Sequence, residues 1–132
     1  MDSLNNLEIE ILQEIIKDNK RDYPFLEIHF PFIYVKSREY TGVGIYVNFE
    51  YSKYFEFNNL NVLITSSKCL TVDMLENELS YVLNITNGRI DFLEIVTNGE
   101  DVLNNEIIDF ELFWNHIIKQ NSKEDLLQIC FC

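Results

Sequence analysis

Apolar residues near the start of the chain recur with the spacing of a helix. The apolar positions are Leu4, Leu7, Ile11, Leu12, Ile15 and Ile16. Charged side chains fall mostly on the other side, at Glu8, Glu10, Glu14, Lys17 and Asp18. Apolar residues three and four apart line one face of a helix, and Ser3 is in position to cap its first turn. The pattern predicts an amphipathic N-terminal helix that lies on a sheet.

The periodicity changes after Thr41 and Gly42, where every second residue is apolar. These positions are Val43, Ile45, Val47 and Phe49, and we expect all four to face inward in a strand. The preceding run, residues 25–40, is rich in aromatic and β-branched residues and is interrupted by Pro31. Proline favours an edge strand or a bent entry over a central strand. Together the two runs predict a first hairpin, in which Ile33 and Val35 share one face.

The pair Asn87 and Gly88 separates two further runs, residues 79–86 and 89–96. An Asn-Gly pair between such runs is the strongest short-range signal for a hairpin with a type I′ turn. Residues 62–65 predict a short strand and residues 51–61 a loop. Residues 71–81 fit a helix or a strand, and we expect a turn or short helix before the second hairpin.

Helical spacing returns near the end of the chain and predicts a second helix from about Asp109 to Gln120. Its apolar positions are Phe110, Phe113, Trp114, Ile117 and Ile118. The length of 132 residues fits a single domain, residues 1–132. The predicted fold class is α+β: an antiparallel sheet built from hairpins, with the N-terminal helix and the C-terminal helix packed on it.

Charge limits the partners that such a domain can bind. The chain has 22 acidic and 10 basic residues and a formal net charge of −12. Strong negative charge disfavours binding to nucleic acid and to anionic membranes, and it attracts basic proteins. Simple acidity of a soluble protein explains the charge equally well. We expect a monomer or a weak homodimer, in which aromatic residues form either a dimer contact or a lid over the core: Tyr51, Tyr54, Phe55 and Phe57.

The cysteines and the start of the chain indicate a cytoplasmic protein. Cys69, Cys130 and Cys132 are odd in number and lack disulfide-like spacing. No histidine or further cysteine lies at ligand spacing from them, so we expect no metal and no cofactor, and we assign Cys130 and Cys132 no role. The first residues lack the basic and apolar regions of a signal peptide.

No catalytic signature stands out in the sequence, and we expect no enzymatic activity. His29 and His116 are not near a recognisable nucleophile motif. Gly42 and Gly44 lack the lysine of a phosphate-binding loop and open a strand, which favours a tight turn. For Arg38 and Glu39 we favour structural roles over ligand binding: pairing of the guanidinium with a cross-strand acid, and acceptance of backbone hydrogen bonds at the turn.

Two segments resemble a group of small bacterial proteins. The first runs from Ser37 through Arg38, Glu39, Tyr40, Thr41, Gly42, Val43 and Gly44 to Phe49, and the second from Asn87 and Gly88 to Glu94. The group has an S-R-E-aromatic-T-G-V-G-aromatic strand followed by D/N-G-x-hydrophobic-x-x-L-E. The likeness covers residues 33–50 and 79–99, and the chain departs from the pattern at Ile95 and Val96, where a glycine and an aromatic residue are expected. The resemblance implies the kind of small protein encoded beside toxins in contact-dependent growth inhibition and polymorphic toxin systems.

The leading hypothesis is an immunity protein that binds and neutralises a cognate, basic toxin domain through an acidic surface. The residues expected to bind the partner are Glu100, Asp101, Glu106, Asp109 and Glu111, with Glu10 and Glu14 on the first helix. The motif residues are expected to be structural: Arg38, Glu39, Tyr40, Thr41, Gly42, Gly44, Asn87 and Gly88. The alternative is a small-molecule-binding or enzymatic domain with a pocket between sheet and helices, lined by Arg38, Glu39, Tyr40 and Tyr46.

Overall fold

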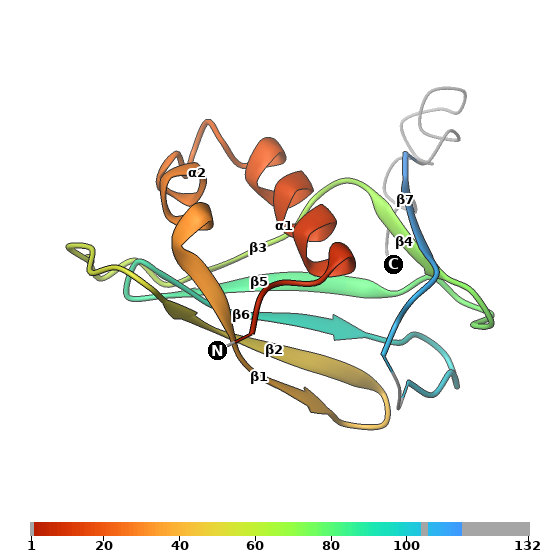
Figure 1. Cartoon of the computed structure of the whole chain (residues 1–132). Coiled ribbons are helices and arrows are strands. Elements are labelled where there is room, and N and C mark those ends of the chain that lie inside the picture. Colours follow the sequence, from red (N-terminus) through yellow and green to blue (C-terminus); the bar gives the residue numbers. More distant parts are fainter. Residues whose placement is uncertain (1, 104–105, 115–132) are drawn as a thin grey trace, which may run out of the picture.

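The computed structural model describes residues 2–103 and 106–114, which form an α+β fold (Figure 1). The helical elements come first: α1 (Asn6–Asp18), α2 (Phe25–His29) and the short 3₁₀ helix η1 (Phe30–Phe32). The strands that follow are β1 (Ile33–Tyr40), β2 (Gly44–Tyr51), β3 (Val62–Ile64), β4 (Cys69–Val72), β5 (Ser80–Thr86), β6 (Arg89–Val96) and β7 (Phe110–Phe113). The expected α+β class with an antiparallel sheet and an N-terminal helix is thus present, and residues 2–103 and 106–114 contain no C-terminal helix.

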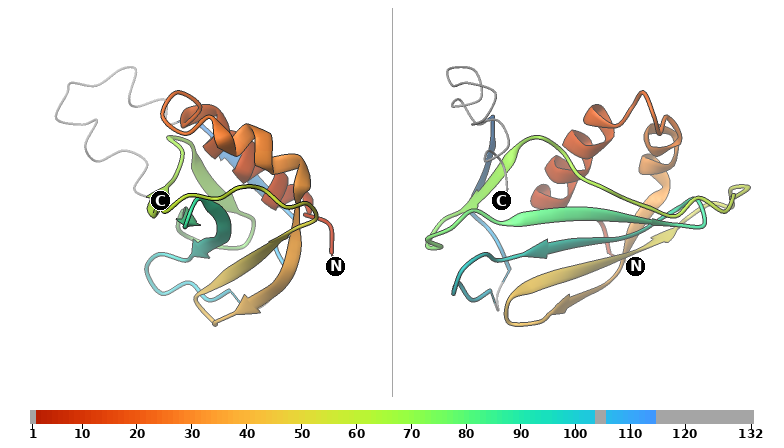
Figure 2. Two further views of the ribbon diagram at one scale, coloured as in Figure 1. Left: turned by 90° about the vertical axis from the view of Figure 1, so that its left-hand side faces the viewer. Right: turned by 180° about the vertical axis from the view of Figure 1, so that it is seen from behind.

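Five strands form an antiparallel sheet in the order β1-β2-β6-β5-β3. Figure 1 and the two views of Figure 2 show α1 and α2 over the same face of this sheet. The core lies between these two layers, where Ile11, Leu12 and Ile15 of α1 meet strand residues such as Leu83 and Leu93, all of them buried. Each such aliphatic side chain contributes about 2 kcal/mol by leaving water. Burial of one face therefore holds the helix on the sheet.

Helix α1 begins at a capping box formed by Asn5 and Glu8. The Asn5 side chain accepts a hydrogen bond from the Glu8 amide (2.9 Å), and the Glu8 carboxylate accepts one from the Asn5 amide (2.8 Å). These reciprocal bonds satisfy backbone donors that the first turn of a helix leaves free. The cap is therefore Asn5, and the expectation that Ser3 caps the helix was wrong.

Both expected hairpins are present, although the pairing register shifts once in each of them, between Val35 and Ser37 and between Asn84 and Ile85. Asn87 (φ 51°) and Gly88 (φ 75°) form the turn between β5 and β6, with the positive φ angles of a type I′ turn. In β2 the alternate residues Ile45, Val47 and Phe49 are buried as expected. Val43 lies before β2 begins and is exposed, so its expected inward position was wrong.

A β-bulge in β1 reverses which residues face the helices. Val35 pairs with Phe49, but the next pair joins Ser37 to Asn48, so one residue is left over between them. An extra residue in one strand shifts every later side chain to the opposite face. Arg38 therefore lies opposite the buried Val47 on the helix side, whereas Glu39 lies on the far face of the sheet.

Two segments adopt structures that the sequence pattern did not predict. Residues 25–32, expected to be extended, form α2 and η1. Pro31 lies in the first turn of η1, where its missing N–H is not needed, so the proline fits a helical start as well as an edge strand. Residues 110–113, expected in a helix, form β7, which pairs with β4 in a second, two-stranded sheet. Residues 115–120 of that predicted helix lie outside the described residues.

Candidate partner-binding surface

An open groove lies where the chain leaves β4 and where it approaches β7. Its volume is about 410 Å³, and a second hollow of about 350 Å³ shares Val72, Asp73, Met74, Leu75 and Asp109 with it. We call the two together the acidic groove. Its lining residues are Thr71, Val72, Asp73, Met74, Leu75, Val102, Leu103, Glu106, Ile107, Ile108, Asp109, Phe110 and Glu111.

The two walls of the acidic groove are held together by backbone contacts and buried anchors. The Asp73 amide donates to the Asp109 carbonyl oxygen (3.1 Å), which joins one wall to the other. The Leu103 amide donates to the Gly42 carbonyl oxygen (2.9 Å), and the side chains of Leu103 and Ile107 are buried in the core. The groove is thus part of the folded framework in the described residues, and it is built from the paired ends of β4 and β7 together with connecting segments.

Three apolar side chains of the acidic groove are exposed to solvent. Met74 is 96% exposed, Ile108 78% and Val102 59%. Val102 precedes the buried Leu103, and Ile108 follows the buried Ile107, so each anchor holds an exposed neighbour outward. Large exposed apolar side chains are unremarkable one at a time, but a group of them rimmed by polar residues is typical of an interaction site.

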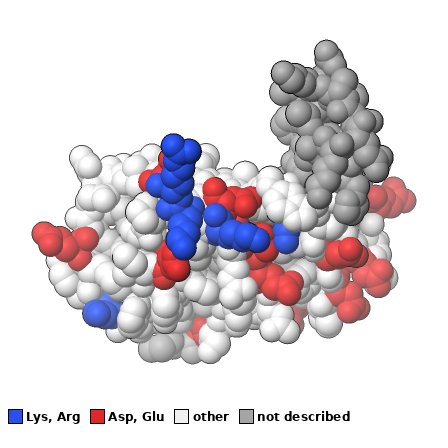
Figure 3. All heavy atoms as spheres, turned by 90° about the horizontal axis from the view of Figure 1, so that it is seen from above, with Lys and Arg blue, Asp and Glu red and all other residues white. Residues whose placement is uncertain are grey.

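Four carboxylates of the acidic groove have no cationic partner among the described residues. Asp73, Glu106, Asp109 and Glu111 are exposed, and none of them takes part in the ion pairs found there. Those pairs use other acids: Glu27 with Lys20, Glu50 with Lys36, Glu8 with Arg38, and Glu14 with Lys68. On the face seen in Figure 3, basic side chains lie over the helices with acidic ones beside them, and further acidic side chains lie at both ends, including the end where β4 and β7 lie.

Only part of the predicted acidic set belongs to this groove. Glu106, Asp109 and Glu111 line it, and Glu100 is exposed outside it. Asp101 instead accepts hydrogen bonds from the amides of residues 76 and 77 (3.4 and 2.9 Å), which ties the turn before β5 to the segment after β6. The groove also contains Asp73 and Met74, which sequence reasoning missed because they lie in a turn far from the acidic run.

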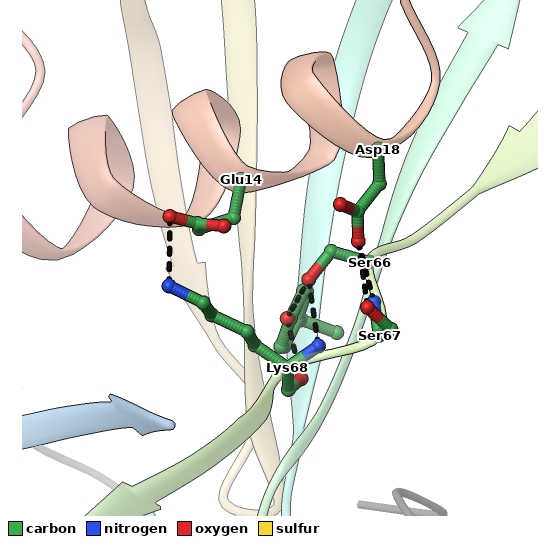
Figure 4. A network of polar contacts seen from close by, with 6 residues as sticks. Glu14, Asp18, Ser66, Ser67 and Lys68 are labelled. Carbon is green, nitrogen blue, oxygen red and sulfur yellow. Dashed lines mark hydrogen bonds and ion pairs between the residues drawn. The ribbon is translucent and has the colours of Figure 1, made fainter. Parts of the chain in front are cut away.

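The first helix uses its acids to hold a connecting segment (Figure 4). The Lys68 ammonium lies 3.0 Å from a Glu14 carboxylate oxygen, and the Asp18 carboxylate accepts from the amide and the hydroxyl of Ser67 (2.8 and 3.0 Å). Ser66 and Ser67 join β3 to β4, so these contacts fix that connection against α1. Glu14, expected at the partner surface, thus has a structural contact, whereas Glu10 is exposed on the helix.

Arg38 joins the first strand to the first helix. Its Nε lies 2.7 Å from Glu8 Oε2 and its Nη2 lies 2.8 Å from Oε1, a two-point contact with a carboxylate that is only 2% exposed. The hydrogen bonds to Glu8 raise the pKa of Arg38 above its ordinary value, in spite of partial burial. Its partner is thus a helix carboxylate, and the expected cross-strand acid was wrong.

The remaining residues of the first motif shape the turn and the far face of the sheet. Glu39 accepts a hydrogen bond from the Asn48 side chain (3.0 Å) rather than from backbone groups at the turn. Thr41 donates its amide to the Gly44 carbonyl oxygen (3.0 Å), and Gly42 has a φ of 89°. A Cβ at Gly44 would overlap the Ile95 carbonyl oxygen, so this glycine permits close approach of β2 and β6.

Residues proposed for a pocket between sheet and helices divide between the two faces. Arg38 and Tyr40 pair with the buried Val47 and Ile45 and lie on the helix side. Glu39 pairs with Tyr46 on the far face. There the hydrogen bond to Glu94 is the largest cause of a raised Tyr46 pKa. The four residues therefore do not converge on one site.

Aromatic residues of the 51–57 segment pack around His29. The Tyr51 hydroxyl accepts a hydrogen bond from the Ile90 amide (2.8 Å) and lies 2.8 Å from His29 Nδ1. The rings of Phe55 and Phe57 also contact the buried imidazole, while Tyr54 is exposed. Tyr51 packs against the core, whereas Phe55 and Phe57 pack on His29 and Tyr51; the dimer contact stays a prediction. Burial lowers the pKa of His29.

Comparisons with protein-family models, with curated proteins and with solved structures return no match for this chain. Within residues 2–103 and 106–114, no group of three histidine, cysteine or acidic side chains is arranged to hold a metal ion. No helix in the same part of the chain is long and apolar enough to cross a membrane.

Proposed function

We propose that this protein is an immunity protein, and that it neutralises a basic toxin domain by binding it at the acidic groove. One observation carries the proposal: the groove combines carboxylates that have no ion-pair partner among the described residues with exposed apolar side chains. The sequence motif that resembles immunity proteins agrees with this function. It lies elsewhere, at the β1–β2 turn and in the β5–β6 hairpin, where its residues have structural contacts.

Electrostatics supports a basic partner in particular. The groove carboxylates, which have no ion pair among the described residues, lie at one end of a chain of net charge −12 and set up a negative potential that steers a cationic protein towards that end. Complementary charge can raise association rates from about 10⁵–10⁶ to 10⁸–10⁹ M⁻¹s⁻¹ at low salt. Rapid capture suits an inhibitor that must act before a toxin reaches its target. The exposed Glu10 and Glu100 add to the same field without lining the groove.

The first experiment identifies the partner and tests neutralisation. The tagged protein is used to capture partners from its native host at low salt, and retained proteins are eluted with high salt and identified by mass spectrometry. The captured toxin domain is then expressed in a sensitive strain with and without this protein. We expect restored growth and a stoichiometric complex that dissociates as salt is raised. A toxin whose activity is unaffected by saturating amounts of this protein would refute the immunity function.

A charge-reversal pair then tests the surface. One variant carries Glu106→Lys, Asp109→Lys and Glu111→Lys, and its control carries Asp22→Lys, Glu27→Lys and Glu56→Lys, which are also exposed and lie outside the groove. The control loses the exposed pair of Glu27 with Lys20, which contributes little to stability. Both variants change the net charge by the same amount. We expect the groove variant to lose at least a hundredfold in affinity, about 2.7 kcal/mol, and the control to lose far less. Equal losses would mean that net charge, and not the groove, determines binding.

A further inference from the structure

The acidic groove presents apolar and acidic side chains in one continuous hollow. Met74, Val102 and Ile108 are exposed within the same lining that contains Asp73, Glu106 and Asp109. A surface that attracted a basic partner by charge alone would need only the carboxylates. We propose that the groove binds a cationic amphipathic segment of the partner, with an apolar side chain seated between Met74 and Ile108 and flanking Lys or Arg side chains at the carboxylates. This inference rests on the proposed function and names the chemistry of its partner.

Met74 gives the clearest indication that the exposed apolar side chains of the acidic groove contact a partner. Its backbone has a φ of 75°, a left-handed conformation that non-glycine residues other than Asn and Asp adopt rarely. Its side chain is 96% exposed, so the isolated fold gains almost no apolar burial from it. Glycine or asparagine would suit the backbone better at this position. A methionine there is flexible and polarisable, and such side chains adapt well to an apolar partner surface.

The charges of the groove restrict the occupant to a cationic one. An apolar segment without positive charge would desolvate Asp73, Glu106 and Asp109 and give them no partner, which is costly for carboxylates. An acidic segment would add repulsion. A segment that carries both apolar and basic side chains covers the exposed residues and pairs the carboxylates at once. The backbone bond between Asp73 and Asp109 fixes the walls before binding, which lowers the ordering cost.

Two synthetic peptides of equal length and charge separate this recognition from simple charge attraction. Each has fourteen residues and the same five lysines; one carries leucines on a single helical face, and the other has glutamine at those positions. Binding to the full-length protein is measured by fluorescence anisotropy, and the contact surface by amide chemical shifts. We expect the leucine peptide to bind at least tenfold more tightly and to shift amides of residues 72–75, 102–103 and 106–109. Equal affinities, or shifts confined to another surface, would overturn the inference.

Variants of the groove connect the peptide result to single residues. Met74→Asn removes the apolar side chain but leaves the charge and suits the left-handed backbone. We expect at least fivefold weaker binding of the leucine peptide, unchanged binding of the glutamine peptide, and a melting temperature that is equal to or higher than that of the wild type. Tyr54→Ser, which removes an exposed aromatic side chain outside the groove, is the control and should change neither affinity. Unchanged leucine-peptide affinity in Met74→Asn would contradict the inference.

Failure of this inference is distinguishable from failure of the proposed function. If Met74→Asn and Ile108→Ser neutralise the toxin as well as the wild type does while the groove charge reversal abolishes neutralisation, the protein is an immunity protein that recognises charge alone. If the peptides and variants behave as expected but no toxin is neutralised, the groove binds cationic amphipathic segments in some other partner. The first result overturns the inference and leaves the proposed function standing. The second result overturns the proposed function and leaves the inference about the groove standing.

Discussion

The contact between Arg38 and Glu8 is the most direct test of how the first strand is joined to the first helix. In Arg38→Ala the Glu8 carboxylate, 2% exposed, loses both of its guanidinium hydrogen bonds. Removing one member of a buried ion pair costs about 3–5 kcal/mol, because the remaining charge stays buried without a partner. A quarter of the Arg38 side chain is exposed, so water can reach the vacated space. We therefore expect a loss of about 2–3 kcal/mol in the free energy of unfolding.

Urea denaturation at pH 7, followed by circular dichroism, measures this loss directly. In a separate thermal unfolding experiment, the same loss should lower the Tm of a domain of this size by about 10 °C. Arg38→Lys keeps the charge but not the two-point geometry, so it should recover only part of the loss. Arginine is the better residue to change, because Glu8 also closes the capping box with Asn5 and its removal would disturb the helix start.

The control is Lys36→Ala, which breaks a pair with Glu50 in which both side chains are substantially exposed and the atoms lie 3.9 Å apart. Exposed pairs contribute little, so this variant should lose less than about 1 kcal/mol. If Arg38→Ala loses no more than Lys36→Ala, the buried contact does not hold the strand to the helix. The bulge that turns Arg38 towards α1 would then need another explanation.

Two further predictions concern the second hairpin and the aromatic cluster. Gly88→Val should lower the free energy of unfolding by at least about 1 kcal/mol, since a β-branched residue resists the positive φ of 75°; an unchanged urea midpoint would contradict this. Burial lowers the pKa of His29, so the unfolded chain binds more protons below its ordinary value near 6.5. Stability is therefore full above pH 6.5 and falls as the pH drops from that value to the lower pKa of the folded state. His29→Gln should flatten this part of the stability profile, measured by urea unfolding between pH 5 and 8, and a profile identical to that of the wild type would rule out the histidine as its source.

The elements that the sequence predicted well are those whose pattern is local. Alternation in residues 45–49 and the Asn87–Gly88 turn depend on neighbours in sequence, and both hairpins are present. Residues 110–113 were mispredicted because Phe110 and Phe113 have helical spacing, whereas their strand forms by pairing with β4, about forty residues away in the chain. A ladder partner that is distant in sequence leaves no local signal. The bulge in β1 is equally hidden, although it decides which face Arg38 occupies.

In the candidate site, too, the sequence predicted residues that lie in one local run and missed those that are brought together from distant segments. The run of acids predicted three of the groove carboxylates, because Glu106, Asp109 and Glu111 lie on one continuous wall. The run of acids did not distinguish these groove carboxylates from Asp101, whose carboxylate accepts hydrogen bonds from backbone amides of a turn far away in sequence. Nor could it find Met74, which is brought to the groove by the return of the chain after β4. The Leu75 amide donates to the Val72 carbonyl oxygen to close the turn that holds Met74, and these apolar neighbours hide Met74 in the sequence pattern.

Added salt should raise the Tm of the free protein and weaken its binding to a basic partner. Both effects follow from the position of the groove carboxylates. In the free protein Asp73, Glu106, Asp109 and Glu111 line one groove without ion pairs among the described residues, so they repel one another and destabilise the fold. Screening at about 0.1 M salt reduces interactions beyond roughly 10 Å, so the Tm of the free protein should rise between 20 and 300 mM sodium chloride. The same screening weakens attraction to a basic partner, so its dissociation constant should increase over that range. A Tm that falls with salt would mean that attractive pairs dominate the surface, and the unpaired carboxylates would then not be the source of the field that steers the partner.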